Sequence, residues 1–208
     1  MKVTFVRPNL FEERSSDAMH PLCFAILKSL TPSDVETKLY DERLEAIAFD
    51  DPTDLVAMTV ETYTARRSYQ IASEFRRRGV PVVMGGYHPT FLPDEALQYA
   101  DSVVTGDAEG VWQQVVEDAR RGKLQPLYSR DGFAPLGGTQ PDHRIFEGKR
   151  YAPISLVQYG RGCRFNCNFC SMKSPMFEIL SKEELNLITE TANSLQTTIR
   201  KQLNSRGQ

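Results

Sequence analysis

The sequence predicts a doubly wound α/β fold, in which helices cover both faces of a parallel β-sheet. Strand-like and helix-like segments alternate with short connections over residues 1–130, a pattern typical of such sheets. Two of the strand-like segments are continuous apolar runs, LVAMTV at 55–60 and VPVVM at 80–84. Runs of this kind indicate strands that are buried on both faces.

Five segments are expected to be strands because they are short and rich in β-branched or apolar residues. They span residues 2–7, 35–40, 55–60, 80–84 and 102–105.

Helical periodicity of apolar residues predicts the helices that alternate with these strands. They span residues 17–30, 65–78, 92–99 and 109–121. The helix at 65–78 is strongly amphipathic, and Gly79 closes it. Cys23 falls on the apolar side of the first helix, so we expect a buried structural thiol there.

The composition is that of a globular protein in a reducing compartment. The formal charge of −2, with 40% hydrophobic and 25% charged residues, gives no reason to expect a nucleic-acid partner. No apolar run reaches the length of a membrane span, and the amino terminus lacks the pattern of a signal peptide. We therefore expect a cytoplasmic protein whose four cysteines are thiols or metal ligands.

Changes in composition and periodicity along the chain divide it into four parts. The sheet domain is expected over 1–128, and a Gly- and Pro-rich stretch at 129–153 is interpreted as a linker. A new strand at 154–158 runs into a cysteine motif, and the two form a part at 154–174. The remaining part, 175–208, has one apolar stripe and predicts a helix at 181–203, a possible docking surface for a protein partner.

The cysteine motif is the most specific feature of the sequence. Cys163, Cys167 and Cys170 have the spacing C-x3-C-x2-C, and a loop of this length can wrap three thiolates around one face of a 4Fe–4S cluster. Three ligands leave one iron open for a small chelating molecule. The alternative is a zinc site, but zinc needs a fourth protein ligand when structural. No second cysteine pair is present, and the spacing of the histidines does not favour any of them as the fourth ligand.

At these residues the sequence resembles the radical-SAM superfamily, which has the same cysteine spacing and an aromatic residue before the last cysteine. Phe169 holds that place here. The resemblance implies that the open iron chelates S-adenosylmethionine (SAM). It also implies that a reducing partner supplies electrons to the cluster. It further implies that the strand at 154–158 is the first strand of a barrel.

The segment 80–110 resembles the cobalamin-binding domain of cobalamin-dependent radical-SAM enzymes, a flavodoxin/Rossmann-like domain. It runs strand, Gly-Gly, His-Pro-Thr, helix, strand and glycine. Gly-Gly alone is ordinary turn chemistry, but ligands of such sheets bind at the carboxyl ends of strands. The residues expected to line a corrin or its nucleotide tail are Thr59, Val60, Glu61, Gly85, Gly86, Tyr87 and Gly106.

The sequence departs from cobalamin domains that bind cobalt through a histidine. Those domains carry Asp-x-His-x-x-Gly after the first strand, and the loop after residue 7 lacks this pattern. His20 precedes Pro21 and is interpreted as a helix-start residue. His88 follows the fourth strand, on the nucleotide side by the resemblance. We therefore expect cobalamin without a histidine lower ligand.

The barrel that the resemblance implies is far longer than the 38 residues that follow Cys170. We therefore expect a truncated relative of these enzymes, with no catalytic residue identifiable. The expected function is that of a cobalamin-dependent radical-SAM protein, a methyltransferase or a truncated form of one. The alternative is a non-catalytic module that binds cobalamin or the cluster and docks onto a partner through its last helix.

Overall fold

The structure is a computed structural model. It describes residues 1–10, 14–130, 134–135, 139–154, 156, 158, 160–163, 165, 167, 178–179 and 186. The chain forms two compact units: unit 1 contains residues 1–134 and 139–153, and unit 2 contains residues 135–138 and 154–208.

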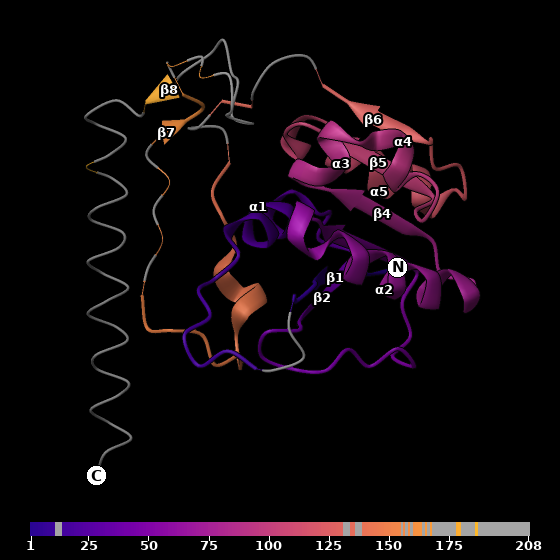
Figure 1. Cartoon of the computed structure of the whole chain (residues 1–208), viewed down its shortest axis with the longest axis horizontal. Helices are drawn as coiled ribbons and strands as arrows, with labels where there is room; N and C mark the ends of the chain where they lie inside the picture. The colour runs from indigo at the N-terminus through magenta and orange to yellow at the C-terminus, as the bar shows by residue number, and fades with distance from the viewer. Residues whose placement is uncertain are drawn as a thin grey trace. The chain divides into compact units, whose positions relative to one another are not determined.

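Unit 1 is built on a parallel sheet with the strand order β2-β1-β3-β4-β5-β6 (Figure 1). The strands are Lys2–Arg7 (β1), Glu36–Asp41 (β2), Leu55–Thr59 (β3), Val82–Gly85 (β4), Ser102–Thr105 (β5) and Leu127–Ser129 (β6). The helices are Leu22–Leu30 (α1), Ala65–Arg77 (α2), Tyr87–Phe91 (α3), Pro93–Ala96 (α4) and Trp112–Arg120 (α5). Short 3-10 helices in the described residues include Thr62–Thr64 (η1), Ala108–Gly110 (η2) and His143–Phe146 (η4). The predicted doubly wound fold is confirmed.

Side chains alternate between the two faces of the sheet, as strand geometry requires. In β3, Leu55 and Ala57 join the apolar cluster that contains residues of α1 and α5. Val56 and Met58 point the other way and join the cluster that contains residues of α2. Both sets are buried, which explains why this strand reads as a continuous apolar run.

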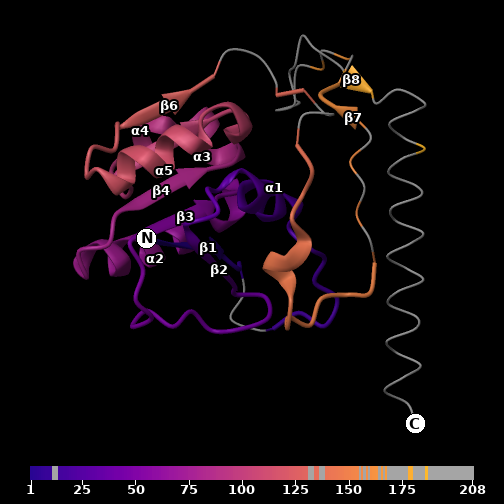
Figure 2. The same ribbon diagram turned by 180° about the vertical axis from the view of Figure 1, so that it is seen from behind.

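The strand order reverses between the neighbouring strands β1 and β3. The chain turns from β1 to β2 on one side and from β3 to β4 on the other, and α1 and α2 pack on opposite faces. Figure 2 shows β1, β2 and β3 together near the centre of the unit. Ligands of open α/β sheets bind where the strand order reverses in this way.

Three elements differ from the sequence prediction. The strand β6 was not expected, because only Tyr128 of its three residues is buried. The helix expected at 17–30 begins only at Leu22. The helix expected at 92–99 is shorter and forms only α4, and the non-helical Leu92 separates it from the preceding α3, which was not expected.

Residues 139–153, interpreted from composition as part of a linker, pack against unit 1. Ile145 and Phe146 are buried in its core. The Asp142 N–H donates to the Ala25 carbonyl at 2.9 Å. Figures 1 and 2 both show the orange turn of η4 beside α1.

Only a small part of unit 2 is described. Gly160–Arg161 (β7) pairs antiparallel with Glu178–Ile179 (β8). Within the predicted strand 154–158, residues 154, 156 and 158 are described and lie outside any strand. Of the predicted helix 181–203 only Asn186 is described, and it is helical. No helix in the described part of the chain is long and apolar enough to cross a membrane.

Candidate functional site at the carboxyl ends of the strands

The predicted glycines lie together at the carboxyl edge of the sheet. Thr59 is the last residue of β3 and pairs in register with Gly85, the last residue of β4. The Val60 N–H donates to the Gly85 carbonyl at 2.8 Å, and the His88 N–H donates to the Val60 carbonyl at 3.1 Å. The loops after β3 and β4 are therefore joined by backbone hydrogen bonds.

Gly86 is required by its backbone conformation and by its close neighbours. Its φ is +102°, a region that side chains strongly disfavour. A Cβ built on this residue would lie 2.9 Å from the Val60 carbonyl oxygen and 3.0 Å from the Thr59 hydroxyl oxygen. Only glycine therefore allows the two loops to approach this closely.

Gly106 serves a different purpose in the loop after β5. Its φ is +72°, but a Cβ built on it would meet no atom within 4 Å. Its N–H donates to the Thr90 hydroxyl at 3.0 Å. The backbone at Gly106 therefore turns sharply and leaves open space beside its Cα atom.

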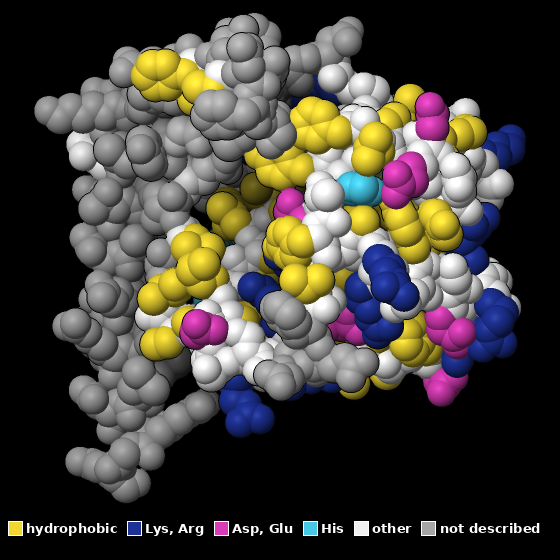
Figure 3. Space-filling view, viewed as in Figure 1, with side chains coloured by type: hydrophobic (Ala, Val, Ile, Leu, Met, Phe, Trp, Pro, Cys, Tyr) yellow, Lys and Arg dark blue, Asp and Glu magenta, His cyan; other side chains and the backbone are white. Residues whose placement is uncertain are grey.

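Large apolar side chains are exposed on the loops around the same edge. Tyr63 is 57% exposed and follows β3, whereas Tyr87 is 48% exposed and follows β4. Figure 3 shows hydrophobic side chains gathered at this surface of the molecule. Leu10, Met19 and Phe91 are also exposed on the segments that follow β1 and β4. Such an apolar rim of Tyr63 and Tyr87 fits a large ring with apolar faces, because it would remove the exposed rings from water.

Polar groups accompany the apolar rim at the ends of β1 and β3. Arg7 Nη2 donates to the Tyr63 hydroxyl at 3.3 Å. Its Nη1 atom is buried without a hydrogen-bond partner. Glu61 caps η1 and accepts a hydrogen bond from the turn. An orphaned guanidinium nitrogen beside a binding edge fits a ligand that brings amide or phosphate oxygens, as cobalamin does.

The expectation of a buried Cys23 was wrong, because the side chain is exposed. The reason is the late start of α1, which leaves Cys23 in the first turn, outside the apolar stripe. The thiol interacts with the Thr59 hydroxyl and lies in the field of Arg7 and Glu61. The protein packed around this exposed residue still raises the pKa of its thiol, chiefly by desolvation.

His88 supports the site from inside the unit. Its side chain is 5% exposed, and its Nε2 lies 2.8 Å from the Tyr69 hydroxyl. That hydroxyl donates to Glu95 Oε1 at 2.9 Å, so it accepts from His88 Nε2–H. Burial, together with the Glu95 carboxylate, raises the pKa of Tyr69. His20, in contrast, packs against the rings of Phe146 and Tyr151, each centroid 4.7 Å away.

Two buried carboxylates organise the loops on the β1–β2 side. Asp41 is fully buried and accepts from Arg43 Nη2 at 2.6 Å and from the Tyr151 hydroxyl at 2.9 Å. Glu42 accepts from Arg67 Nη2 at 2.6 Å. It also accepts from the Asn9 N–H at 3.2 Å, which holds the loop after β1.

Sequence reasoning missed Arg7, Tyr63 and Thr90 as parts of this edge. The His-Pro-Thr segment after Gly-Gly was the available signal for Thr90, because it begins a helix directly after a strand end. Nothing in the sequence marks Arg7 or Tyr63, whose roles depend on the pairing of β1 with β3.

The cysteine motif lies in unit 2 and is only partly described. Cys163 is half-buried and Cys167 is exposed, and Gly162 before them has a φ of +80°. Cys170 and Phe169 lie outside the described residues. Within the described residues no group of three or more His, Cys, Asp or Glu side chains is arranged to hold a metal. The predicted three-thiolate set therefore stays a prediction.

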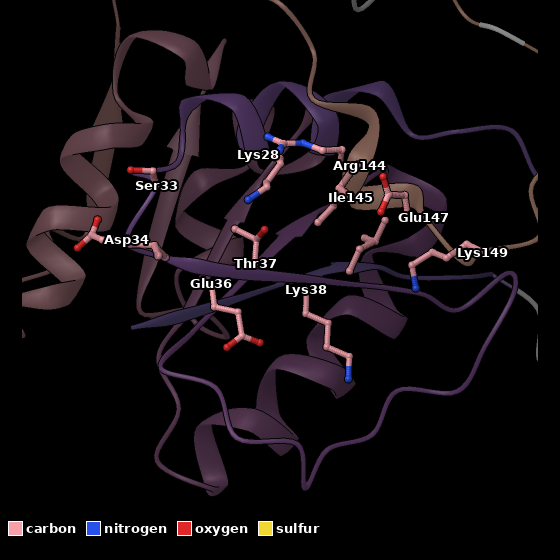
Figure 4. Close-up of a pocket in the computed structure, with 12 residues that line it drawn as sticks. Lys28, Ser33, Asp34, Glu36, Thr37, Lys38, Arg144, Ile145, Glu147 and Lys149 are labelled. Carbon is pink, nitrogen blue, oxygen red and sulfur yellow. The ribbon is translucent and has the colours of Figure 1, made fainter. Parts of the chain in front are cut away.

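A separate pocket of about 650 Å³ lies at the amino end of β2 (Figure 4). Lys28, Lys38 and Arg144 line it together with acidic side chains. Lys38 pairs with Asp51 and Arg144 with Asp142, both at 2.6 Å. Two of the three cations are thus paired with protein carboxylates, and the pocket, at the amino end of β2, is distinct from the carboxyl edge.

Residues 20–116 match a family model described as the B12 binding domain. The match includes the loops after β3, β4 and β5 but begins after β1. No solved structure shows a significant match to the chain.

Two curated relatives are methyltransferases of Chlorobaculum tepidum. Its bacteriochlorophyllide d C-8(2)-methyltransferase is 35% identical over 170 residues, which cover 76% of this chain and 37% of that protein. Its bacteriochlorophyllide d C-12(1)-methyltransferase is 27% identical over 188 residues, covering 87% of this chain and 41% of that protein.

A third relative has a different reaction in its name. The anaerobic magnesium-protoporphyrin IX monomethyl ester cyclase of Rubrivivax gelatinosus is 29% identical over 143 residues, 55% of this chain and 26% of that protein. The chain thus spans less than half the length of each of these three relatives.

Proposed function

We propose that this chain, which belongs to the family of cobalamin-dependent radical-SAM proteins and carries a B12-binding domain, uses the carboxyl edge of its sheet to bind cobalamin for methyl transfer. The observation that carries the proposal is the family match of residues 20–116, which spans the glycine loops. Gly86 and Gly106 both have positive φ on that edge.

The predicted residues have distinct proposed roles in holding the corrin. Gly85 and Gly86 let the backbone approach it, and Gly106 offers an open backbone turn. Tyr87 adds an apolar face to the rim. Thr59, Val60 and Glu61 form the adjoining loop after β3. Bound cobalamin would supply a transferable methyl group on cobalt.

We further propose that the corrin binds without a histidine lower ligand. His88 is buried with its Nε2 engaged by Tyr69, and His20 packs against two aromatic rings. The electron paramagnetic resonance spectrum of the cob(II)alamin form tests this directly. Nitrogen superhyperfine splitting from a protein imidazole would contradict the proposal, and its absence would support it.

The cysteine motif is proposed to bind a 4Fe–4S cluster through Cys163, Cys167 and Cys170, with SAM on the open iron and Phe169 beside it. The spacing and the family membership support this assignment. A bound cluster of this kind would supply the electron for the reductive cleavage of SAM. The thiolate ligands require a reducing environment, so we place the protein in the cytoplasm with a reducing electron donor.

Methyl transfer is the preferred reaction class because both Chlorobaculum tepidum relatives are named as methyltransferases. Cyclisation is the second candidate, favoured by the Rubrivivax gelatinosus relative. No substrate is proposed, because the family match covers only the cofactor domain.

Cobalamin binding is tested by adding hydroxocobalamin to the full chain under anaerobic conditions and following its absorption spectrum. Tyr87→Ala should weaken binding several-fold because the rim loses an aromatic face. Tyr99→Ala is the matched control, since Tyr99 stacks on Tyr69 and lies outside the rim. No binding by the wild-type chain, or equal binding by both variants, would contradict the proposed site.

The cluster is tested separately by anaerobic reconstitution with iron and sulfide, followed by iron quantitation and electron paramagnetic resonance. A 4Fe–4S signal that changes on addition of SAM is expected. Cys167→Ala should abolish it and Cys23→Ala should not. Equal iron content in the two variants would contradict the proposed ligand set.

A further inference from the structure

Thr90 connects the two positive-φ glycines of the carboxyl edge. Its hydroxyl donates to the Gly86 carbonyl at 2.7 Å and accepts from the Gly106 N–H at 3.0 Å. The Thr90 N–H also donates to the Gly86 carbonyl, at 3.2 Å. One side chain therefore bridges the loop after β4 and the loop after β5.

The bridge needs a group that donates and accepts at the same position. A hydroxyl does both, and valine, which has nearly the same shape as threonine, does neither. The side chain of Thr90 is half-buried, and its bond to the Gly86 carbonyl is partly shielded from water. Without the hydroxyl, the Gly106 N–H would lose the partner that holds it toward the sheet.

The strands themselves leave this connection open. The recorded β4–β5 register joins Val83 with Ser102 and Met84 with Val103 and stops before the glycines. The loops after β3 and β4 are joined by backbone bonds at Val60, but the loop after β5 has no such bond to Gly85 or Gly86 among the described residues. Thr90 supplies the link.

We propose that Thr90 is a positioning residue for cobalamin, because it fixes the spacing between the Gly86 and Gly106 loops against which the corrin lies. This inference rests on the proposed binding of cobalamin at this edge. Thr90 acts through the two glycine backbones and is not assigned a direct contact with the ligand.

The test compares Thr90→Val with Thr90→Ser in the full chain, with hydroxocobalamin as the probe. Thr90→Val should raise the Kd about tenfold, the effect of one lost hydrogen bond. Thr90→Ser keeps the hydroxyl and should stay within about threefold of the wild type, because a serine loses only a methyl group. Thr37→Val on β2 is the matched control and should bind as the wild type.

A second measurement does not depend on cobalamin. Amide hydrogen exchange at Gly106 should be faster in Thr90→Val than in the wild type, and unchanged in Thr90→Ser and Thr37→Val. This readout separates loss of the bridge from general destabilisation, which would also speed exchange in the core strands.

The outcomes distinguish the two proposals. A wild-type chain that binds no cobalamin overturns the proposed function and the positioning role with it. A wild-type chain that binds, together with a Thr90→Val variant of equal affinity, overturns the positioning role alone. The same conclusion follows if Thr90→Ser binds as weakly as Thr90→Val, because the hydroxyl would then not be the active group.

Discussion

The two halves of the carboxyl edge are held together by different kinds of interaction. On the β3–β4–β5 side, backbone hydrogen bonds and the Thr90 hydroxyl join the loops. On the β1–β2 side, the buried carboxylates of Asp41 and Glu42 hold arginines and more distant loops.

This difference indicates which half is preorganised independently of charge. Neutral backbone bonds depend little on pH or salt. Buried ion pairs depend on every partner being present, because a charge that loses its partner is costly to keep buried. The glycine side should therefore keep its geometry under conditions that loosen the β1–β2 side.

The largest expected effect comes from breaking the charged side at Asp41. Asp41→Ala would leave the Arg43 guanidinium without its bidentate partner and the Tyr151 hydroxyl without its acceptor. We expect a loss of about 3–5 kcal/mol in the free energy of unfolding, measured by urea denaturation.

Asp34→Ala provides the matched control for Asp41→Ala. Asp34 forms an exposed ion pair with Arg120, so its loss should cost less than about 1 kcal/mol. Equal losses in the two variants would contradict the assigned difference between buried and exposed carboxylates.

A smaller effect is expected from breaking the glycine side at Gly86. Gly86→Ala combines a positive φ with a Cβ only 2.9 Å from the Val60 carbonyl oxygen, which should cost about 2–4 kcal/mol. Gly79→Ala has a φ of +79° but no atom within 4 Å of the new Cβ. It should therefore cost about 1 kcal/mol. Thermal unfolding of both variants checks the difference, and an equal loss would mean that the close approach is relieved by movement.

The pH dependence of stability extends the comparison to a carboxylate away from the carboxyl edge, Asp51, which accepts from Lys2, Lys38 and Tyr40. Hydrogen bonds from Lys38 lower the pKa of Asp51 to about 2 in the folded chain. The carboxylate therefore contributes stability above its unfolded pKa, near 3.8, and this contribution is lost as the pH falls toward about 2.

We expect this contribution to be about 1 kcal/mol after solvent screening. Urea denaturation between pH 5 and pH 2, set by these two pKa values, should show a shallower pH dependence for Asp51→Asn than for the wild type. Parallel curves for the variant and the wild type would mean that folding does not lower the pKa of the Asp51 carboxyl.

The smallest effect is expected at Cys23, and it concerns the reactivity of the thiol, not the stability of the fold. In a chain with the other three cysteines replaced by serine, alkylation by iodoacetamide should accelerate about tenfold per pH unit, up to the Cys23 thiol pKa of about 11. A plateau near pH 9, the ordinary thiol pKa, would contradict the desolvation of this residue. Added hydroxocobalamin should slow the reaction if the thiol borders the binding edge.

The sheet was predictable because its strands carry their own signals. The apolar run of β3 and the glycines after β4 and β5 are local features of the sequence. The strand β6 could not be predicted in this way, because only Tyr128 is buried in it. The packing of residues 139–153 also escaped local reasoning, since Ile145 and Phe146 stand alone in a Gly- and Pro-rich stretch.

The candidate site divides in the same way. Gly86 and Gly106 were identified at the sequence level because strand ends and glycine make a local pattern. Arg7, Tyr63 and Thr90 were not, because each acts through a partner brought close by the strand order. Cys23 was misjudged because the periodicity extended the first helix beyond its actual start at Leu22.

The packing of residues 139–153 also determines where unit 1 could be cut for separate expression. A fragment ending at residue 128 would lack Ile145 and Phe146, which pack in the core with Phe24 and Leu39. It would also lack Tyr151, whose hydroxyl donates a hydrogen bond to the Asp41 carboxylate. It would expose apolar surface beside β2, the edge strand, and such an edge invites aggregation. We therefore expect an autonomous, soluble fragment to extend to residue 153.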